Sequence, residues 1–144
     1  MPSFSPERYE SGTLPTPAIV GLYEGIRFVQ ETGVDCIGTH MRQLNRQLQH
    51  RLLSMDEIEV AVPNCVGSVL LFRSNAIPAD RLGEMLNDLG FCVRTGFHCS
   101  ALAHKTLGTP PTGAIRVSPS IFTTAQEMEL LADAVQELLH EAHP

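Results

Sequence analysis

The chain has 144 residues, 43% of them hydrophobic, and its formal net charge is −6 at pH 7. This length and composition suit one globular domain over residues 1–144. The negative charge argues against a nucleic-acid partner, because phosphates require a basic surface. No apolar run approaches the roughly 20 residues of a membrane-spanning helix, and the N-terminus has no basic and apolar segments typical of a signal peptide.

The cysteines and the single lysine limit the chemistry further. Cys36, Cys65, Cys92 and Cys99 have neither a CxxC spacing nor the density of a disulfide framework. We therefore expect free thiols in a reducing, cytoplasmic compartment. Lys105 is the only lysine among the 10 basic residues, so a reaction that needs a lysine must use Lys105 or borrow one from elsewhere.

After an N-terminal loop, the first half of the chain predicts two helices. The first has Thr16 as its N-cap and Pro17 in its first position, and it ends at Gly33. Its apolar stripe, which should pack against the sheet of the fold, follows helical spacing: Ile19, Leu22, Ile26 and Val29. The second helix extends from about Asp35 to Leu53. Its expected buried face is Ile37, Met41, Leu44 and Leu48.

The second half predicts strands that alternate with helices. The segments with strand character are residues 57–62, 67–72, 90–93 and 113–118, of which the first two suit a hairpin. One helix opens at Pro78, and the last begins at Thr124, where Glu127 completes a capping box. This order predicts an α+β fold, in which several helices pack against a small, mainly antiparallel sheet. The sheet should contain Val60, Leu70, Val93 and Ile115.

Residues 93–100, Val-Arg-Thr-Gly-Phe-His-Cys-Ser, are the stretch with the most chemical information. Gly96 permits a sharp turn after the predicted strand. Residues 101–107 then predict a short helix, which Gly108 ends. Cys99 therefore lies at the start of this helix.

The surroundings of Cys99 favour a thiolate. The helix N-terminus, His98 if it is protonated and Arg94 if it turns toward the loop each stabilise negative charge. A structural cysteine more often lies inside an apolar run, as Cys92 does. We therefore interpret Cys99 as a reactive thiol and expect Cys92 to be buried and slow to react.

Two other segments admit two interpretations from their residues alone. Arg116 projects from the side of its strand opposite to Ile115 and Val117. It is either a surface arginine or a bidentate partner for a carboxylate. Residues 11–13, Ser-Gly-Thr, are either an entry loop or a phosphate contact through Thr13 and backbone N–H groups.

Together these residues resemble the C-terminal small domain of class V aminotransferase-like, fold-type I pyridoxal phosphate enzymes, and most of all cysteine desulfurases and selenocysteine lyases. The resemblance rests on residues 10–13, 93–99 and 115–118, which span nearly the whole chain. The middle segment is close to the Arg-x-Gly-His-His-Cys-Ala pattern of group II desulfurases. Phe97 replaces the first histidine of that pattern and Ser100 replaces the alanine.

The resemblance implies a role for each matched residue. Cys99 is the nucleophile that takes sulfur from L-cysteine, or a related amino acid, as a persulfide. Arg116 holds the substrate α-carboxylate, while Arg94 and His98 line the site. Thr13 hydrogen-bonds the phosphate of pyridoxal 5'-phosphate across the interface of a homodimer. A sulfur-acceptor protein is a further expected partner.

The resemblance also implies a missing half. The family holds pyridoxal phosphate as a Schiff base on a lysine of a large N-terminal domain. Lys105 has no cofactor role in the matched motif, so we expect it to be an exposed lysine. The chain therefore looks like an excised domain or one product of a split gene. By itself it should be inactive and should not bind the cofactor covalently.

Three functional hypotheses follow from the sequence. The chain is the small domain of a pyridoxal phosphate-dependent cysteine desulfurase, or a standalone non-catalytic binding or dimerisation module with the same fold. It is, thirdly, part of a class V enzyme of other specificity, such as a β-lyase or an aminotransferase. The joint presence of Cys99, Arg116 and Thr13 favours the first, because a scaffold needs none of them.

Overall fold

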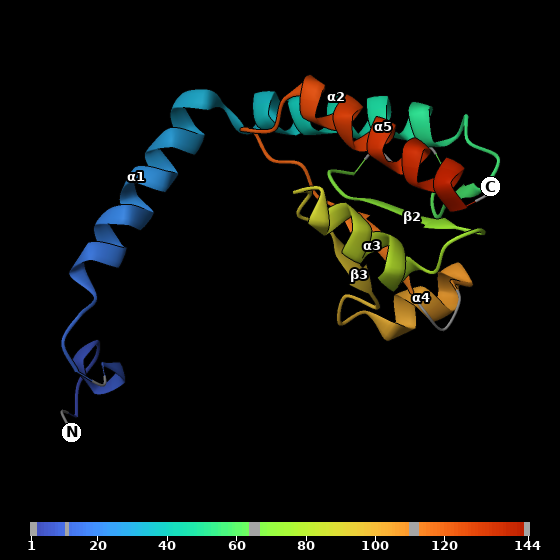
Figure 1. The fold of residues 1–144 in the computed structure, drawn as a ribbon. Helices are drawn as coiled ribbons and strands as arrows, with labels where there is room; N and C mark the ends of the chain where they lie inside the picture. Colours follow the sequence, from blue (N-terminus) through green and yellow to red (C-terminus); the bar gives the residue numbers. More distant parts are fainter. Residues whose placement is uncertain (1–2, 11, 64–66, 110–112, 143–144) are drawn as a thin grey trace. The chain divides into compact units, whose positions relative to one another are not determined.

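The computed structural model describes residues 3–10, 12–63, 67–109 and 113–142. Its backbone forms two compact units, residues 1–37 and 38–144. Each unit has its own pattern of burial, and the sheet lies in the second (Figure 1). The single domain expected over residues 1–144 stays a prediction.

The second unit is built on an antiparallel sheet whose strands, within the described residues, follow the order β1-β2-β4-β3. The strands are β1 (Ile58–Val60), β2 (Leu70–Ser74), β3 (Arg94–Gly96) and β4 (Ala114–Val117). The predicted hairpin forms, with Val60 opposite Phe72. Every pair in the sheet is antiparallel, which confirms the predicted α+β fold with an antiparallel sheet.

One face of this sheet carries the core. Phe72 and Ile115 face each other across β2 and β4, and both are 0% exposed. The helices that contribute to the core are α2 (Val34–Leu52), α3 (Ala79–Asp88) and α5 (Ala125–Ala142). The largest fully buried side chains are Leu48, Leu52, Phe72, Leu82, Leu86, Ile115 and Val135. Burial of each such side chain contributes about 1.5–3 kcal/mol.

Helices α2 and α5 lie side by side, as Figure 1 shows. The Arg51 guanidinium of α2 forms ion pairs with Glu129 and Asp133 of α5, the second at 2.6 Å. These carboxylates raise the pKa of Arg51, with Asp133 the larger cause. The two helices are therefore held together by ion pairs at the surface and by apolar side chains of the core.

The capping box predicted at the start of α5 is present. The Thr124 backbone N–H donates to the Glu127 carboxylate at 2.7 Å, and the Glu127 N–H donates to the Thr124 hydroxyl at 3.2 Å. The bond from the Thr124 backbone, followed by that from its hydroxyl, holds the pKa of Glu127 below its usual range. The reciprocal bonds satisfy backbone donors that a helix start leaves free.

The third predicted strand is displaced. Residues 91–93 have no regular secondary structure, and β3 begins at Arg94, so placing Val93 in the sheet was wrong. The Phe91 N–H donates to the Leu86 carbonyl at the end of α3, and the Val93 N–H donates to Phe91. These donors serve the helix end and a turn, so they are not free for a strand ladder. Val93 nevertheless packs partly against the core.

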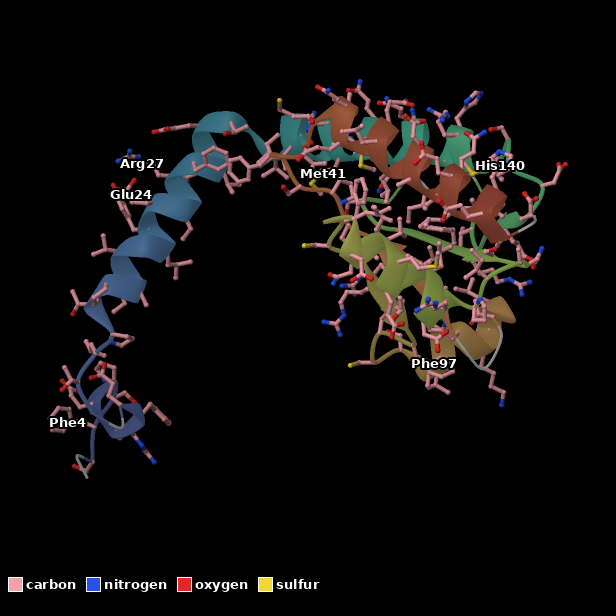
Figure 2. All side chains as sticks on the ribbon, viewed as in Figure 1. Phe4, Glu24, Arg27, Met41, Phe97 and His140 are labelled. Atoms are coloured by element: carbon pink, nitrogen blue, oxygen red, sulfur yellow. The ribbon has the colours of Figure 1, made fainter. Side chains whose placement is uncertain are left out.

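The first unit contains a short 3₁₀ helix (Glu7–Tyr9) and α1 (Thr16–Thr32). Thr16 is the first helical residue and Pro15 is the N-cap, so the predicted cap was one residue late. Arg27 pairs with Glu24 and Glu31 on the surface of α1, and Figure 2 labels Glu24 and Arg27 there.

The apolar stripe of α1 is helical but exposed. Its four members are Ile19 at 49%, Leu22 at 65%, Ile26 at 50% and Val29 at 39%. The periodicity therefore predicted the helix correctly and its burial wrongly. None of the helices in the described ranges combines the length and apolar character that a membrane crossing requires.

Candidate functional site

The loop between β3 and α4 (Ala101–Leu107) has an unusual backbone. His98 and Cys99 are consecutive non-glycine residues with positive φ, 52° and 59°. Left-handed conformations cost an L-residue roughly 1–2 kcal/mol, and such strain concentrates at functional sites. The Ser100 N–H donates to the Phe97 carbonyl at 2.8 Å and closes the turn. The strained turn presents Cys99 as an exposed, free thiol.

The short helix predicted after Cys99 is confirmed. Ser100 is the N-cap of α4, and Gly108 ends it with a φ of 64°. Cys99 thus precedes the N-terminus of α4. Phe97, which replaces a histidine of the desulfurase pattern, lies in the same loop (Figure 2).

Two glycines hold the base of this loop in place. Gly113 has a φ of 76°, and a Cβ there would overlap the backbone of Gly96. Gly96 has a φ of 94° and ends β3 opposite Ala114. Because only glycine permits both the conformation and the approach, β4 can lie directly against the start of the Cys99 loop.

Arg116 lies on the face of the sheet opposite to the core, as its alternation predicted. Its register partners are Leu71 on β2 and Arg94 on β3. The Arg116 Nε is buried and has no hydrogen-bond partner among the described residues. Arg73, on the same face, instead pairs with Glu59 on β1. A buried guanidinium N–H without a partner costs about 1–3 kcal/mol, so it suits a site where a ligand supplies the acceptor.

A pocket of about 210 Å³ forms around Arg116. It lies between α4 and the sheet, and its lining residues are Val69, Leu71, His98, Ser100, Ala103, His104, Leu107 and Arg116. Arg116 and two histidines supply the basic groups, Ser100 supplies a hydroxyl, and the other lining side chains are aliphatic. The two residues that flank Cys99 in the chain both line it. This arrangement suits a small carboxylate bound near the loop that carries Cys99.

The folded protein favours the neutral ring of His98. Burial is the main cause that lowers its pKa below the usual 6.5, and the positive charges of Arg116 and Arg94 add to this effect. A hydrogen bond to the Arg94 carbonyl opposes it. The lowered pKa disfavours the protonated ring at neutral pH, so the contribution to a Cys99 thiolate that a protonated His98 would make is disfavoured there.

The hydrogen bond of His98 also fixes its tautomer. The His98 Nε2 lies 3.2 Å from the Arg94 carbonyl oxygen, which can only accept. Nε2 therefore carries the proton in the neutral ring, and Nδ1 is left as the basic nitrogen. His98 can accept a proton there or a hydrogen bond from a ligand.

His104 is a site residue that sequence reasoning missed. It is 2% exposed, and its ring packs edge-on to Phe97 at a centroid distance of 5.3 Å. The His98 ring lies 5.5 Å from it, tilted by 36°. The signal was its place in α4, four residues after Ser100, because this spacing turns a side chain back toward the loop.

The other cysteines differ from the expectation in part. Cys92 is exposed, so the prediction of a buried Cys92 was wrong; it lies in the irregular segment that replaces the predicted strand. Cys36 is exposed as well. Cys65 lies outside the described residues. Exposure alone therefore does not separate Cys99 from Cys36 and Cys92.

The structure places the predicted site residues in both units. Arg94, His98, Cys99 and Arg116 belong to residues 38–144, whereas Thr13 belongs to residues 1–37. Thr13 is exposed, and nothing lies within 4 Å of a Cβ built at Gly12. Ser11 lies outside the described residues.

Lys105 is exposed on α4, as expected. Within the described ranges, no group of three or more metal-ligating side chains occurs.

Comparison with known proteins identifies the class. The profile of the aminotransferase class-V family matches residues 3–131. The chain therefore belongs to this family.

Within this family, the chain is similar to cysteine desulfurases. A probable cysteine desulfurase of Halobacterium salinarum is 32% identical over 134 residues, which cover 92% of this chain and 32% of that protein. The apo structure of a cysteine desulfurase from Thermococcus onnurineus NA1 matches with a TM-score of 0.83 at 26% identity, covering 94% of this chain and 34% of that one. A cysteine desulfurase structure from Escherichia coli shares the fold, with a TM-score of 0.81 at 20% identity. The chain thus spans about a third of the length of these relatives.

Proposed function

We propose that this chain is the small domain of a pyridoxal phosphate-dependent cysteine desulfurase, in which Cys99 accepts the sulfur. The unpartnered Nε of Arg116, in a pocket lined by the two neighbours of Cys99, is the observation that carries the proposal. The likeness to cysteine desulfurases over nearly the whole chain supports it.

In this proposal Arg116 binds the α-carboxylate of L-cysteine. The carboxylate supplies the acceptor that the buried Nε–H lacks, and a charge-assisted bond is about twice as strong as a neutral one. Apolar side chains around the pocket exclude water and strengthen the attraction. The bound carboxylate then directs the substrate sulfur toward the loop that carries Cys99.

The sulfur transfer balances without an external oxidant. The Cys99 thiolate attacks the substrate sulfur, a new S–S bond forms, and the substrate C–S bond breaks. The electron pair of that bond leaves with the carbon skeleton, which takes up a proton and departs as L-alanine. In this proposal the neutral His98, whose Nδ1 carries no proton, accepts the Cys99 proton before the attack. Arg94, the register partner of Arg116 on β3, is in this proposal a further residue of the site.

Pyridoxal phosphate, when bound, supplies the electron sink that weakens the bonds of the substrate amino acid. This chain offers an exposed hydroxyl at Thr13, beside open space at Gly12, as a contact for the cofactor phosphate. Lys105 lies on the exposed surface of α4, so the Schiff-base lysine belongs to a large domain in this proposal. The complete enzyme is then a cytoplasmic homodimer that passes sulfur from Cys99 to an acceptor protein.

Mass spectrometry tests the proposal in the chain assembled with its large domain and loaded with pyridoxal phosphate. After incubation with L-cysteine, the peptide that contains Cys99 should carry one additional sulfur atom, and an equal amount of L-alanine should form. Cys99→Ser should abolish both products, whereas Cys92→Ser is the matched control and should change neither. Formation of pyruvate, ammonia and sulfide that persists in Cys99→Ser, without alanine, favours a β-lyase-like class V enzyme. No product from the wild-type assembly favours a non-catalytic module.

A further inference from the structure

We propose that His104, held by Thr109, is a positioning residue that fixes His98 and the Cys99 loop beside Arg116. This role rests on the desulfurase function proposed above and assigns a task to a residue outside the matched motif.

Thr109 fixes the orientation of the His104 ring. The Thr109 hydroxyl donates to the His104 carbonyl oxygen at 3.1 Å. The Thr109 hydroxyl oxygen also lies 2.8 Å from His104 Nδ1. A hydroxyl has one proton to donate, and Thr109 donates it to the His104 carbonyl. Towards Nδ1 the hydroxyl oxygen can therefore only accept, so Nδ1 carries the proton of that bond. The neutral His104 ring is therefore the Nδ1–H tautomer, and Nε2 carries no proton.

The fixed ring supports both residues before Cys99. Phe97 packs edge-on to His104, with an interplanar angle of 87°, and His98 lies tilted against it. His104 is the buried member of the three, whereas Phe97 is 42% exposed. His104 thus forms the inner wall against which the rings of the loop rest.

This support matters because the loop is strained. His98 has a φ of 52° and Cys99 a φ of 59°, and such conformations persist only when the surroundings determine them. The groups that act on His98 are Arg94 on β3, Arg116 on β4 and His104 on α4. If His104 is released, the loop relaxes, the His98–Arg94 bond loosens and water reaches the His98 ring.

Nitrogen NMR of the imidazole rings tests the proposal on this chain, with no dependence on catalysis. In the wild type, His98 should show the Nε2–H tautomer and His104 the Nδ1–H tautomer. Thr109→Val removes the hydroxyl at nearly constant volume. It should give a mixture of tautomers at both rings, and the titration midpoint of His98 should rise toward the usual value of about 6.5.

Two variants separate this role from general damage to α4. Thr109→Ser keeps the hydroxyl and should restore the wild-type spectrum. Thr106→Val is the matched control and should leave both histidines unchanged, because among the described residues the Thr106 hydroxyl bonds to the Leu102 carbonyl of its own helix. Unchanged tautomers and midpoint in Thr109→Val, or the same change in Thr106→Val, would overturn the proposal.

If Thr109→Val does not fold, His104→Phe takes its place in the test. Phenylalanine refills the site but cannot bond to Thr109, so His98 should lose its single tautomer. Retention of that tautomer would overturn the proposal.

Kinetics on the assembled enzyme then ask whether the positioning matters for turnover. Thr109→Val should lower kcat about tenfold with little change in KM, and Thr109→Ser should restore it. NMR changes in an assembly without desulfurase activity would support the positioning and count against the proposed function alone.

Discussion

The two faces of the sheet in residues 38–144 are built for different tasks. On the core face, Phe72 and Ile115 are completely buried among helices. On the opposite face, which we call the site face, Arg73 is paired with Glu59, but Arg116 keeps a buried N–H without a partner among the described residues. The first face stabilises the fold, and the second leaves hydrogen-bonding capacity for a ligand next to a strained loop. The difference predicts that substitutions on the two faces separate stability from binding.

The largest effect should follow truncation on the core face. Phe72→Ala should lower the free energy of unfolding by about 3–5 kcal/mol, because it removes a fully buried ring and leaves a cavity. Leu71→Ala, the next residue on the opposite face, is half-buried and should cost less than half as much. Urea denaturation of both variants measures the difference. Equal losses would contradict the division between the faces.

The second prediction concerns the close contact between the start of β4 and the start of the Cys99 loop. Gly113→Ala should cost about 1–3 kcal/mol, because alanine is strained at its φ of 76° and its Cβ would overlap Gly96. Gly108→Ala is the control, since Gly108 has a φ of 64° but open space around it. Thermal melting measures the stability of both variants, and the additional loss of stability in Gly113→Ala reports the close approach to Gly96. If both variants melt alike, β4 does not press on the loop base.

The capping box of α5, a helix of the core face, should have a smaller effect. Thr124→Ala should cost about 1 kcal/mol, as for other N-caps. Because the pKa of Glu127 is lowered in the folded state, its contribution is present above the usual value of 4.5 and is lost as the pH falls through the lowered pKa. Denaturation between pH 7 and pH 3 should show this loss in the wild type and a weaker one in Thr124→Ala. The same slope in both proteins would exclude the capping box as its source.

The smallest effect belongs to His98 on the site face. Its pKa is lowered in the folded state, so the folded loop favours the neutral ring. The resulting stability is present above the usual value of 6.5 and is lost as the pH falls through the lowered pKa. Amide hydrogen exchange in residues 96–100 should therefore quicken in mild acid, and His98→Gln should remove this dependence. Exchange that is independent of pH, after correction for intrinsic rates, would contradict it.

The sequence predicted the elements better than their surroundings. Helical spacing predicted α1, but it could not show that Ile19 and Leu22 would be exposed. Periodicity identifies the apolar face of a helix and does not show whether another element packs against it. The apolar character of residues 90–93 predicted a strand. In the structure, however, the Phe91 N–H donates to the Leu86 carbonyl at the end of α3 and is not available to a strand partner. That local bond also explains why Cys92 lies outside the sheet and is exposed.

The candidate site shows the same limit. Strand alternation placed Arg116 on the correct face, and the turn signal at Gly96 placed Cys99 before a short helix. The neutral state of His98 and the burial of His104 depend on packing between α4, β3 and β4, which no local pattern contains. The registers of β2, β3 and β4 bring Leu71, Arg94 and Arg116 together.

The most direct test of the account compares two arginines on the site face, Arg116 and Arg73. In the enzyme assembled with its large domain, Arg116→Gln should raise the KM for L-cysteine at least tenfold, because a charge-assisted bond contributes about 1.5–3 kcal/mol. Arg73→Gln should leave KM unchanged, since Arg73 is occupied by Glu59. A KM that rises equally in both variants, or in neither, would contradict the assignment of Arg116 as the carboxylate-binding residue.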